Sequence, residues 1–486
     1  MKNLIKQLFL AILPGAHQFW NCHSRLRGND RKISIFLRRL ICFVTVICFS
    51  TQAFAVPLIR DAEIEHTLRL YADPIFKVGG LNPANVHIFI VEDDAINSYV
   101  AGGANMFIYT GLIMACPTPD MLIGVMAHES GHIVGGHLAQ GAEQLKHAEL
   151  GSILSFILGA AAGVAARDSS AAAAVISGGQ SMVARNYLAF SRAHEEQADT
   201  FALEAMDKLG ISAYGFLKVF ELLRRDEREH GGTPDPYMLT HPLTAVRIDH
   251  VRNHVENSKI PEGQYPHKFD LPHQRMIAKL YGFLESPERT LMKYPLSNHS
   301  VPARMARAIA YYKMPDLKRS LQEMDSLIAQ SPDDPFFHEL KGQILFENDR
   351  PKEALASYQE AVRLLPDSPL ILSDLAKVEL AQGEAPLVPS AIAHLEKSIL
   401  LDNSNADAWH LLATAYGKAG NNGMAALSLA EEALLEGDPK MALQQADEAL
   451  ASLKEDAPAR QRAHDARAAA LQMQREQKKQ QDQSPF

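Results

Sequence analysis

The chain has 486 residues and is 47% hydrophobic, which excludes an intrinsically disordered protein and predicts two or three domains. The formal net charge is −9, from 48 basic and 57 acidic residues. Residues 1–55 hold eight of the basic residues and one of the acidic ones, so the remainder carries 40 − 56 = −16. An acidic remainder of this kind is a poor candidate for binding nucleic acid.

The N-terminal region has the order of a secretory signal peptide. Arg38 and Arg39 precede an apolar run from Leu40 to Phe49, and the small-residue site Ala53–Ala55 follows, which predicts cleavage after Ala55. The apolar run is too short to span a bilayer, which needs about 20 residues, so a retained anchor is the less favoured alternative. Residues 1–37 match no targeting element, and a misplaced translation start would explain them.

The next 200 residues mix strand and helix patterns. Strand-like runs occupy Val86–Val91 and Met106–Thr110, and a helix is expected over Met121–Leu138. Thr118 is placed to cap that helix, which puts His128 inside it. Cys116 is the only cysteine after the predicted cleavage site, so an internal disulfide is excluded.

Residues 150–184 form an apolar stretch rich in small residues. Leu150–Ala166 contains no charge, and a second run, Ala171–Ala184, follows after Arg167 and Asp168. Each run is shorter than a typical membrane span, which favours a soluble or interfacial helical hairpin. A membrane-embedded hairpin is the alternative.

The C-terminal half repeats itself with a period of 34 residues after a proline-rich linker that carries one helical run, Met276–Leu284. Tyr311 and Pro332 of one unit align with Leu345 and Pro366 of the next. Small residues at fixed positions let paired helices approach closely, which is typical of tetratricopeptide repeats. An irregular helical bundle is the alternative. Three units carry the pattern in Gly342, Ala354, Tyr358 and Ala361, then Leu372, Leu375, Ala376 and Ala391, then Trp409, Leu412, Ala413, Tyr416 and Ala425.

The sequence His128-Glu129-Ser130-Gly131-His132 has the spacing of a zinc site on a helix. Residues i and i+4 project from the same face, so His128 and His132 can bind one zinc ion. Glu129 can then direct its carboxylate at a water molecule held by that ion.

A catalytic zinc needs a third protein ligand, and an acidic helical segment supplies the candidate. Glu195 and Asp199 are again four residues apart, so Glu195 can coordinate zinc while Asp199 fixes the orientation of an imidazole. A solvated helix face is the alternative interpretation. His137, His147 and His194 are expected at the surface or beside the ligands.

Three motifs in this order, HESGH at 128–132, SRAHEEQAD at 191–199 and THPLTAVR at 240–247, resemble the M48 family of gluzincin metallopeptidases. The resemblance implies that His128, His132 and Glu195 bind one zinc ion per chain and that Glu129 is the general base. It also implies that Asp199 supports a ligand and that Arg247 stabilises the oxyanion. His241 is expected, on the same resemblance, to be able to occupy the fourth zinc position in a closed state.

The segment from Gly102 to Tyr109 resembles the family's edge strand beside the active site. The resemblance implies that an extended peptide pairs with this edge, and the expected substrate-binding residues are Gly103, Ala104, Asn105 and Met106. An ordinary sheet strand after a glycine-rich turn is the alternative.

With a signal peptide and C-terminal repeats, the resemblance implies a periplasmic metalloendopeptidase that cleaves misassembled outer-membrane proteins. Its repeats are expected to bind these clients or the barrel-assembly machinery, with peripheral membrane contact. Two alternatives stay open: a repeat-based chaperone with little proteolysis, and a membrane-embedded protease. Cleavage preference and oligomeric state are not predicted.

The expected fold class is α+β and mainly helical, a gluzincin-type domain with a small sheet followed by a helical-repeat solenoid. The expected parts are the signal peptide with its extension (1–55), the peptidase domain (56–258), a linker with a docking helix (259–302), the repeats (303–459) and a charged helix with a disordered tail (460–486).

Overall fold

The computed structural model describes residues 57–141, 191–229, 241–455 and 458–483. Residues 1–56, which include the predicted signal peptide, lie outside the described residues. The predicted hairpin at 150–184 lies outside them too. Within the described part of the chain, no helix has the length and apolar character to cross a membrane.

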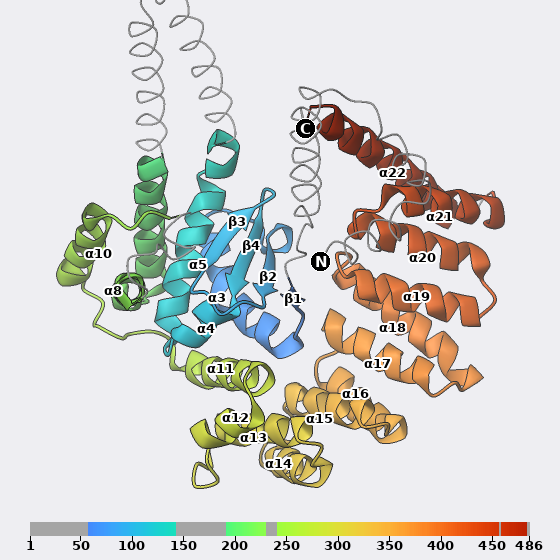
Figure 1. Cartoon of the computed structure of the whole chain (residues 1–486), viewed down its shortest axis with the longest axis horizontal. Coiled ribbons are helices and arrows are strands. Elements are labelled where there is room, and N and C mark those ends of the chain that lie inside the picture. Colours follow the sequence, from blue (N-terminus) through green and yellow to red (C-terminus); the bar gives the residue numbers. More distant parts are fainter. Residues whose placement is uncertain (1–56, 142–190, 230–240, 456–457, 484–486) are drawn as a thin grey trace, which may run out of the picture. The chain divides into compact units, whose positions relative to one another are not determined.

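The N-terminal part of the described chain, residues 57–257, contains a four-stranded mixed sheet with the order β1-β2-β4-β3 (Figure 1). Strand β2 (His87–Val91) is parallel to β4 (Asn105–Tyr109), and both confirm predicted strands. Strands β1 (Leu58–Ile59) and β3 (Ser98–Ala101) pair antiparallel to β2 and β4. These two strands were not predicted, because two to four residues are too few for an alternating pattern to stand out.

Strand β4 is not an edge strand, so the expectation for Gly103–Met106 is wrong. Asn105 and Met106 lie on β4, which is paired on one side with β2 and on the other with β3. Gly102 and Gly103 form the turn that precedes it, with φ of 55° and 95°. Met106 is buried in the core, and among the described strands the edge next to β4 is β3.

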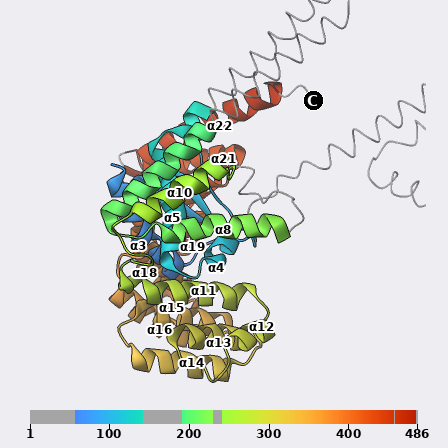
Figure 2. The same cartoon turned by 90° about the vertical axis from the view of Figure 1, so that its left-hand side faces the viewer.

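Helices cover one face of the sheet and enclose a single apolar core. Buried Ile90 and Ile108 of the sheet share this core with Leu122 and Phe216. Figure 2 shows α8 and α10 side by side, in agreement with their packing contact. The helices of this part are α3 (Ala62–Val78), η2 (Pro83–Asn85), α4 (Thr110–Ala115), α5 (Pro119–Val134), an unlabelled helix at 191–209, α8 (Tyr214–Glu229) and α10 (Ala245–Asn257).

Helix α5 is shorter than predicted. It ends at Val134 rather than Leu138, because Gly135 caps it and Gly136 takes a φ of 63°. Thr118 occupies the N-cap position as expected, but its side chain makes no capping hydrogen bond. The break after Val134 redirects the chain close to the site described below.

The C-terminal half is a solenoid of helix pairs, as the repeat pattern predicts. Successive first helices begin at Val301, Pro335 and Pro369, in steps of 335 − 301 = 34 and 369 − 335 = 34. The third unit contains an additional short helix, η4 (Ala385–Leu387), between its two helices. The helices are η3 (His267–Phe269), α11 (Asp270–Leu284), α12 (Pro287–Lys293), α13 (Val301–Lys313), α14 (Leu317–Gln330), α15 (Pro335–Glu347), α16 (Pro351–Leu364), α17 (Pro369–Ala381), α18 (Val388–Leu401), α19 (Ala406–Lys418), α20 (Asn422–Leu435), α21 (Pro439–Ser452) and α22 (Pro458–Gln483).

The disordered tail expected within residues 460–486 is wrong through Gln483, because α22 continues to that residue. The buried alanines Ala463, Ala466 and Ala470 pack α22 on α20 and α21. The residues that follow are mostly Gln, Lys and Glu, which are good helix formers, and they continue a helix that is already nucleated.

The predicted docking helix is α11, and a buried charge cluster joins it to both neighbouring parts. Lys279 of α11 is fully buried, and its Nζ lies 2.8 Å from Asp61, 3.6 Å from Glu63 and 3.2 Å from Glu339. Asp61 caps α3 of the N-terminal part, whereas Glu339 belongs to α15 of the repeats. The cluster therefore joins the first repeats to the start of the N-terminal part.

Candidate metal centre

Helix α5 presents two imidazoles on one face. His128 and His132 are buried, and their Nε2 atoms lie 3.1 Å apart. The four-residue spacing explains this approach, because such positions project from the same side of a helix. Ring planes inclined by 76° let both Nε2 atoms point at one space.

Glu195 comes from the helix at 191–209 and completes a three-residue group. Its Oε2 lies 3.4 Å from Nε2 of His128, and its Oε1 lies 3.4 Å from Nε2 of His132. Gly131 permits the approach of the two helices, because a Cβ there would lie 2.8 Å from the Cα of Ala198. The glycine inside the histidine motif is therefore needed for the third donor to reach the pair.

His241 brings a fourth donor atom to the group. Its Nδ1 lies 3.4 Å from Nε2 of His128 and 3.2 Å from both carboxylate oxygens of Glu195. Donors about 2.0–2.1 Å from a tetrahedral zinc are about 3.3 Å from one another. The separations of 3.1–3.4 Å given above fit that geometry, and one donor atom from each of the four residues lies within 4.8 Å of the others, so these residues can hold one metal ion.

A carboxylate and a guanidinium lie directly behind these donors. The Nδ1 of His128 lies 2.9 Å from Oδ1 of Asp199, so Asp199 can fix the orientation of this ring. Arg247 donates from Nε to Oδ2 of Asp199 at 2.6 Å and from Nη2 to Oδ1 at 2.8 Å. Its Nη1 lies 2.8 Å from Oε2 of Glu195.

Arg247 is buried among protein groups. Its side chain is 1% exposed, and Nη1 also donates to the main-chain oxygens of His241 and Pro242. The guanidinium also lies over the ring of Phe220, 5.2 Å from its centroid. These contacts hold Asp199, Glu195 and the His241 turn together, and the oxyanion role stays a prediction.

Burial and charge set the protonation of the donors. Burial alone would lower the pKa of His128, but bonds to Asp199 and Glu195 outweigh it and raise the pKa to about 9. Burial and the neighbouring rings of His128 and His241 lower the pKa of His132 well below its usual value. Burial would raise the pKa of Glu195, yet the charges of His241 and His128 lower it. In the metal-free site these shifts favour an ionised Glu195, a neutral His132 and a protonated His128, so His128 must lose a proton before it can bind a metal ion.

Glu129 lies beside the donor group and is held by the edge strand. The hydroxyl of Ser98 on β3 donates to Oε1 of Glu129 at 2.9 Å. The other oxygen, Oε2, is buried without a hydrogen-bond partner among the described residues. An unsatisfied buried carboxylate oxygen next to a metal site is suited to accept a proton from a water molecule there.

Ser98 was not singled out from the sequence, because it lies on a strand that the sequence pattern did not reveal. His137 was expected at the surface or beside the ligands, and the structure places it beside His132. His137 follows the Gly135–Gly136 break, and its Nδ1 lies 3.1 Å from Nδ1 of His132. Neighbours on a helix surface are three or four residues apart, whereas His137 is five residues from His132. The turn at the glycines therefore brings the two rings together.

Residues 59–255, which include this donor set, match the model described as Peptidase family M48, and the chain is a metalloendopeptidase. It is 23% identical over 416 residues to the beta-barrel assembly-enhancing protease of Yersinia pestis, which covers 82% of each chain. The protein of the same name from Escherichia coli K12 is also 23% identical, over 79% of this chain and 78% of its own.

Other similarities cover smaller parts. The metalloprotease YcaL of Escherichia coli K12 is 27% identical over 36% of this chain and 64% of its own length. Among solved structures, the tetratricopeptide-repeat protein YrrB is 19% identical over 37% of this chain and 94% of its own, with a TM-score of 0.30.

Proposed function

We propose that the protein is a zinc metalloendopeptidase in which His128, His132 and Glu195 bind the metal and Glu129 is the general base. The observation that carries the proposal is the convergence of these three residues and His241 on one buried point, with donor separations suited to tetrahedral zinc. A bound zinc ion would polarise the scissile carbonyl and lower the pKa of a coordinated water molecule.

The surrounding residues prepare this reaction. Glu129 accepts a proton from the attacking water through its free Oε2, while Ser98 holds the other oxygen. Asp199 keeps His128 oriented, and Arg247 keeps Asp199 and Glu195 in place. Proton transfer by a positioned carboxylate contributes typically about 10²- to 10⁴-fold to a reaction rate.

The arrangement supports a closed resting state controlled by His241. The donor atom of His241 lies at the fourth corner of the group, which a catalytic site must leave open for water. The residue begins a short turn before α10, held by Arg247 through the carbonyls of His241 and Pro242. Movement of this turn would free the fourth position and activate the enzyme.

Strand β3 is the proposed site of substrate pairing, in place of the segment predicted from the sequence. The amide of Tyr109 donates to the carbonyl of Asn97, so the alternation of an antiparallel ladder directs the main chain of Ser98 and Val100 away from β4. A peptide paired at this edge would pass beside Glu129, because Ser98 contacts that residue.

The proposed location is the periplasm, and the proposed clients are unfolded or misassembled outer-membrane proteins. Support comes from the two relatives named beta-barrel assembly-enhancing protease, each matched over more than three quarters of both chains. The signal-peptide pattern before residue 56 agrees with export. Contact with the barrel-assembly machinery through the repeats belongs to the same proposal.

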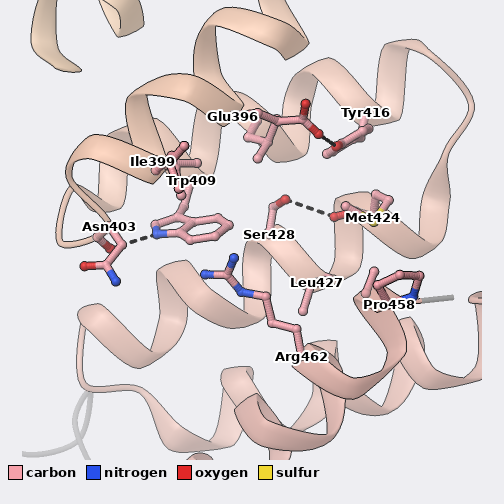
Figure 3. A pocket seen from close by; sticks show the side chains of 13 residues that line it. Glu396, Ile399, Asn403, Trp409, Tyr416, Met424, Leu427, Ser428, Pro458 and Arg462 are labelled. Carbon is pink, nitrogen blue, oxygen red and sulfur yellow. Dashed lines mark hydrogen bonds between the residues drawn. The ribbon is translucent and has the colours of Figure 1, made fainter. Parts of the chain in front are cut away.

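A second candidate function, the holding of unfolded clients, is favoured by a cavity in the repeats. The cavity has a volume of about 520 Å³ and lies between α18, α19, α20 and α22 (Figure 3). Trp409 lines it, with the guanidinium of Arg462 at 4.5 Å from the ring centroid. Leu400, which also lines the cavity, is 85% exposed. An exposed apolar side chain of this kind can contact apolar side chains of an unfolded client.

Replacement of the base tests the proposed function. Glu129→Gln should bind zinc like the unchanged protein but cleave casein and unfolded barrel proteins about 10²- to 10⁴-fold more slowly. Glu204→Gln, which changes an exposed carboxylate on the helix of Glu195, is the matched control and should cleave normally. Full activity of Glu129→Gln would overturn the proposal.

The holding function can be tested separately in a variant that is expected not to cleave its clients. In the Glu129→Gln background, Leu400→Glu should weaken protection of an unfolded barrel protein from aggregation. Leu435→Glu, at a position that is 45% exposed and does not line the cavity, should protect normally. Equal protection by both variants would exclude this cavity as the holding site.

A further inference from the structure

Resting on the proposed function, we propose that His137 is a positioning residue that fixes the tautomer and the ring orientation of the zinc ligand His132. Its Nδ1 lies 3.1 Å from Nδ1 of His132, and its Nε2 lies 3.1 Å from Oε1 of Gln197. His137 therefore stands between one metal ligand and the helix that carries another, Glu195.

The hydrogen-bond directions follow from the last acceptor in this chain of contacts. The Oε1 of Gln197 can only accept, so His137 carries its proton on Nε2 and has a lone pair on Nδ1. That lone pair accepts the Nδ1–H of His132. His132 is then left with a lone pair on Nε2, the atom that faces His128 and Glu195.

The two metal-binding imidazoles are thus oriented in different ways. His128 has a carboxylate behind it, because its Nδ1 lies 2.9 Å from Asp199. His132 has a neutral imidazole behind it, which orients the ring without adding a second negative charge to a site that already holds Glu195 and Asp199. Hydrogen bonds of this kind to the second nitrogen of a ligand are worth about 10- to 100-fold in metal affinity.

The chain is shaped to seat this ring. A Cβ at Gly135 would lie 2.2 Å from Nε2 of His137, so only glycine leaves room for the imidazole. Gly136 supplies the φ of 63° that turns the chain beneath His132. His194 stacks on the ring at 4.1 Å between centroids and 5° between planes, and His137 is 5% exposed. The break that shortens α5 therefore has a structural use.

Two substitutions at His137 separate positioning from packing. His137→Phe keeps a flat ring against His194 but has no acceptor, so zinc affinity measured by chelator competition should fall about 10- to 100-fold. His137→Asn replaces Nδ1 with an amide oxygen that can accept from His132, so it should recover most of that loss. The absorption spectrum of the cobalt-substituted protein should change in His137→Phe and return towards normal in His137→Asn.

The matched control is His254→Phe, which removes a histidine bonded to Asp207 that contacts none of the donor residues. It should bind zinc normally, and the thermal midpoints of the metal-free variants should show whether each one folds. Normal zinc affinity in His137→Phe, or equal loss in folded His137→Phe and His137→Asn, would overturn the inference. Failure of the unchanged protein to bind zinc would instead remove the proposed function, so the two failures are distinguishable.

Discussion

Arg247 and Asp199 form a bidentate ion pair that is almost completely buried, with Nε to Oδ2 at 2.6 Å and Nη2 to Oδ1 at 2.8 Å. The same guanidinium reaches Glu195 at 2.8 Å and the carbonyl of Pro242 at 3.1 Å. One side chain therefore connects the proposed third metal ligand, the residue behind His128 and the turn that carries His241. This relationship links α10, distant in sequence from α5, to the candidate metal site.

Replacement of Arg247 by alanine should destabilise the folded protein. Arg247→Ala leaves the carboxylates of Asp199 and Glu195 buried without their cation, so the free energy of unfolding should fall by about 3–5 kcal/mol. Arg252→Ala on the same helix removes an exposed pair with Asp249 and should cost less than about 1 kcal/mol. Denaturant unfolding of the metal-free proteins measures both, and similar stability of the two variants would refute the assigned role of Arg247.

Loss of the fourth donor should increase proteolysis. In His241→Ala the position beside Glu195 becomes open to water while His128, His132 and Glu195 remain, so the initial rate of casein cleavage should rise above that of the unchanged protein. His250→Ala, on the exposed side of α10, serves as the control. An unchanged or lower rate in folded, zinc-loaded His241→Ala would show that this histidine does not close the site.

A single methyl group between the two metal-binding helices should weaken the site. In Gly131→Ala the new Cβ would lie 2.8 Å from the Cα of Ala198, so the helices must separate and Glu195 must move away from the histidines. Zinc affinity should fall by at least about tenfold, the effect typical of disturbed ligand orientation. Gly417→Ala has open space around its Cβ and should bind zinc normally. Unchanged affinity in Gly131→Ala would contradict the close-packing explanation.

The buried cluster around Lys279 should make stability depend on pH. Burial raises the pKa of Glu339 from 4.5 to about 8, against the opposing effect of Lys279. Between these values the folded protein holds a proton that the unfolded chain has lost, so the free energy of unfolding falls as pH rises through this window. The slope from this group is at most about 1.4 kcal/mol per pH unit and ends above about pH 8.

Glu339→Gln cannot ionise, so its thermal midpoint should fall less between pH 5 and pH 8 than that of the unchanged protein. Part of the slope should remain, because burial also raises the pKa of Asp374 to about 7. Glu353→Gln, which alters an exposed carboxylate paired with Arg350, should retain the full slope. Identical pH profiles in Glu339→Gln and the unchanged protein would contradict this account.

The proposed metal donors were predicted from the sequence in two ways. The four-residue interval of His128 and His132 fixes their shared face in any helix, and the resemblance to a known family pointed to Glu195, Asp199 and His241. The repeats could also be predicted, because the 34-residue period remains visible when individual residues differ between units.

Features that depend on chain reversal or on neighbours in space could not be predicted. His137 reaches His132 only because Gly136 adopts a positive φ, which the sequence permits but does not require. The edge position of β3 depends on strand order rather than on its own four residues. The direction of the Arg247 guanidinium is set by buried carboxylates from another helix, so its contacts could not be predicted from the motif alone.

The central claim is that His128, His132 and Glu195 hold one zinc ion next to Glu129. Elemental analysis of the purified chain, dialysed after exposure to zinc, tests it directly. We expect one zinc per chain in the unchanged protein and in Glu129→Gln, and none in His128→Ala with His132→Ala. Absence of zinc from the folded unchanged protein, or equal zinc content in the double variant, would contradict the account.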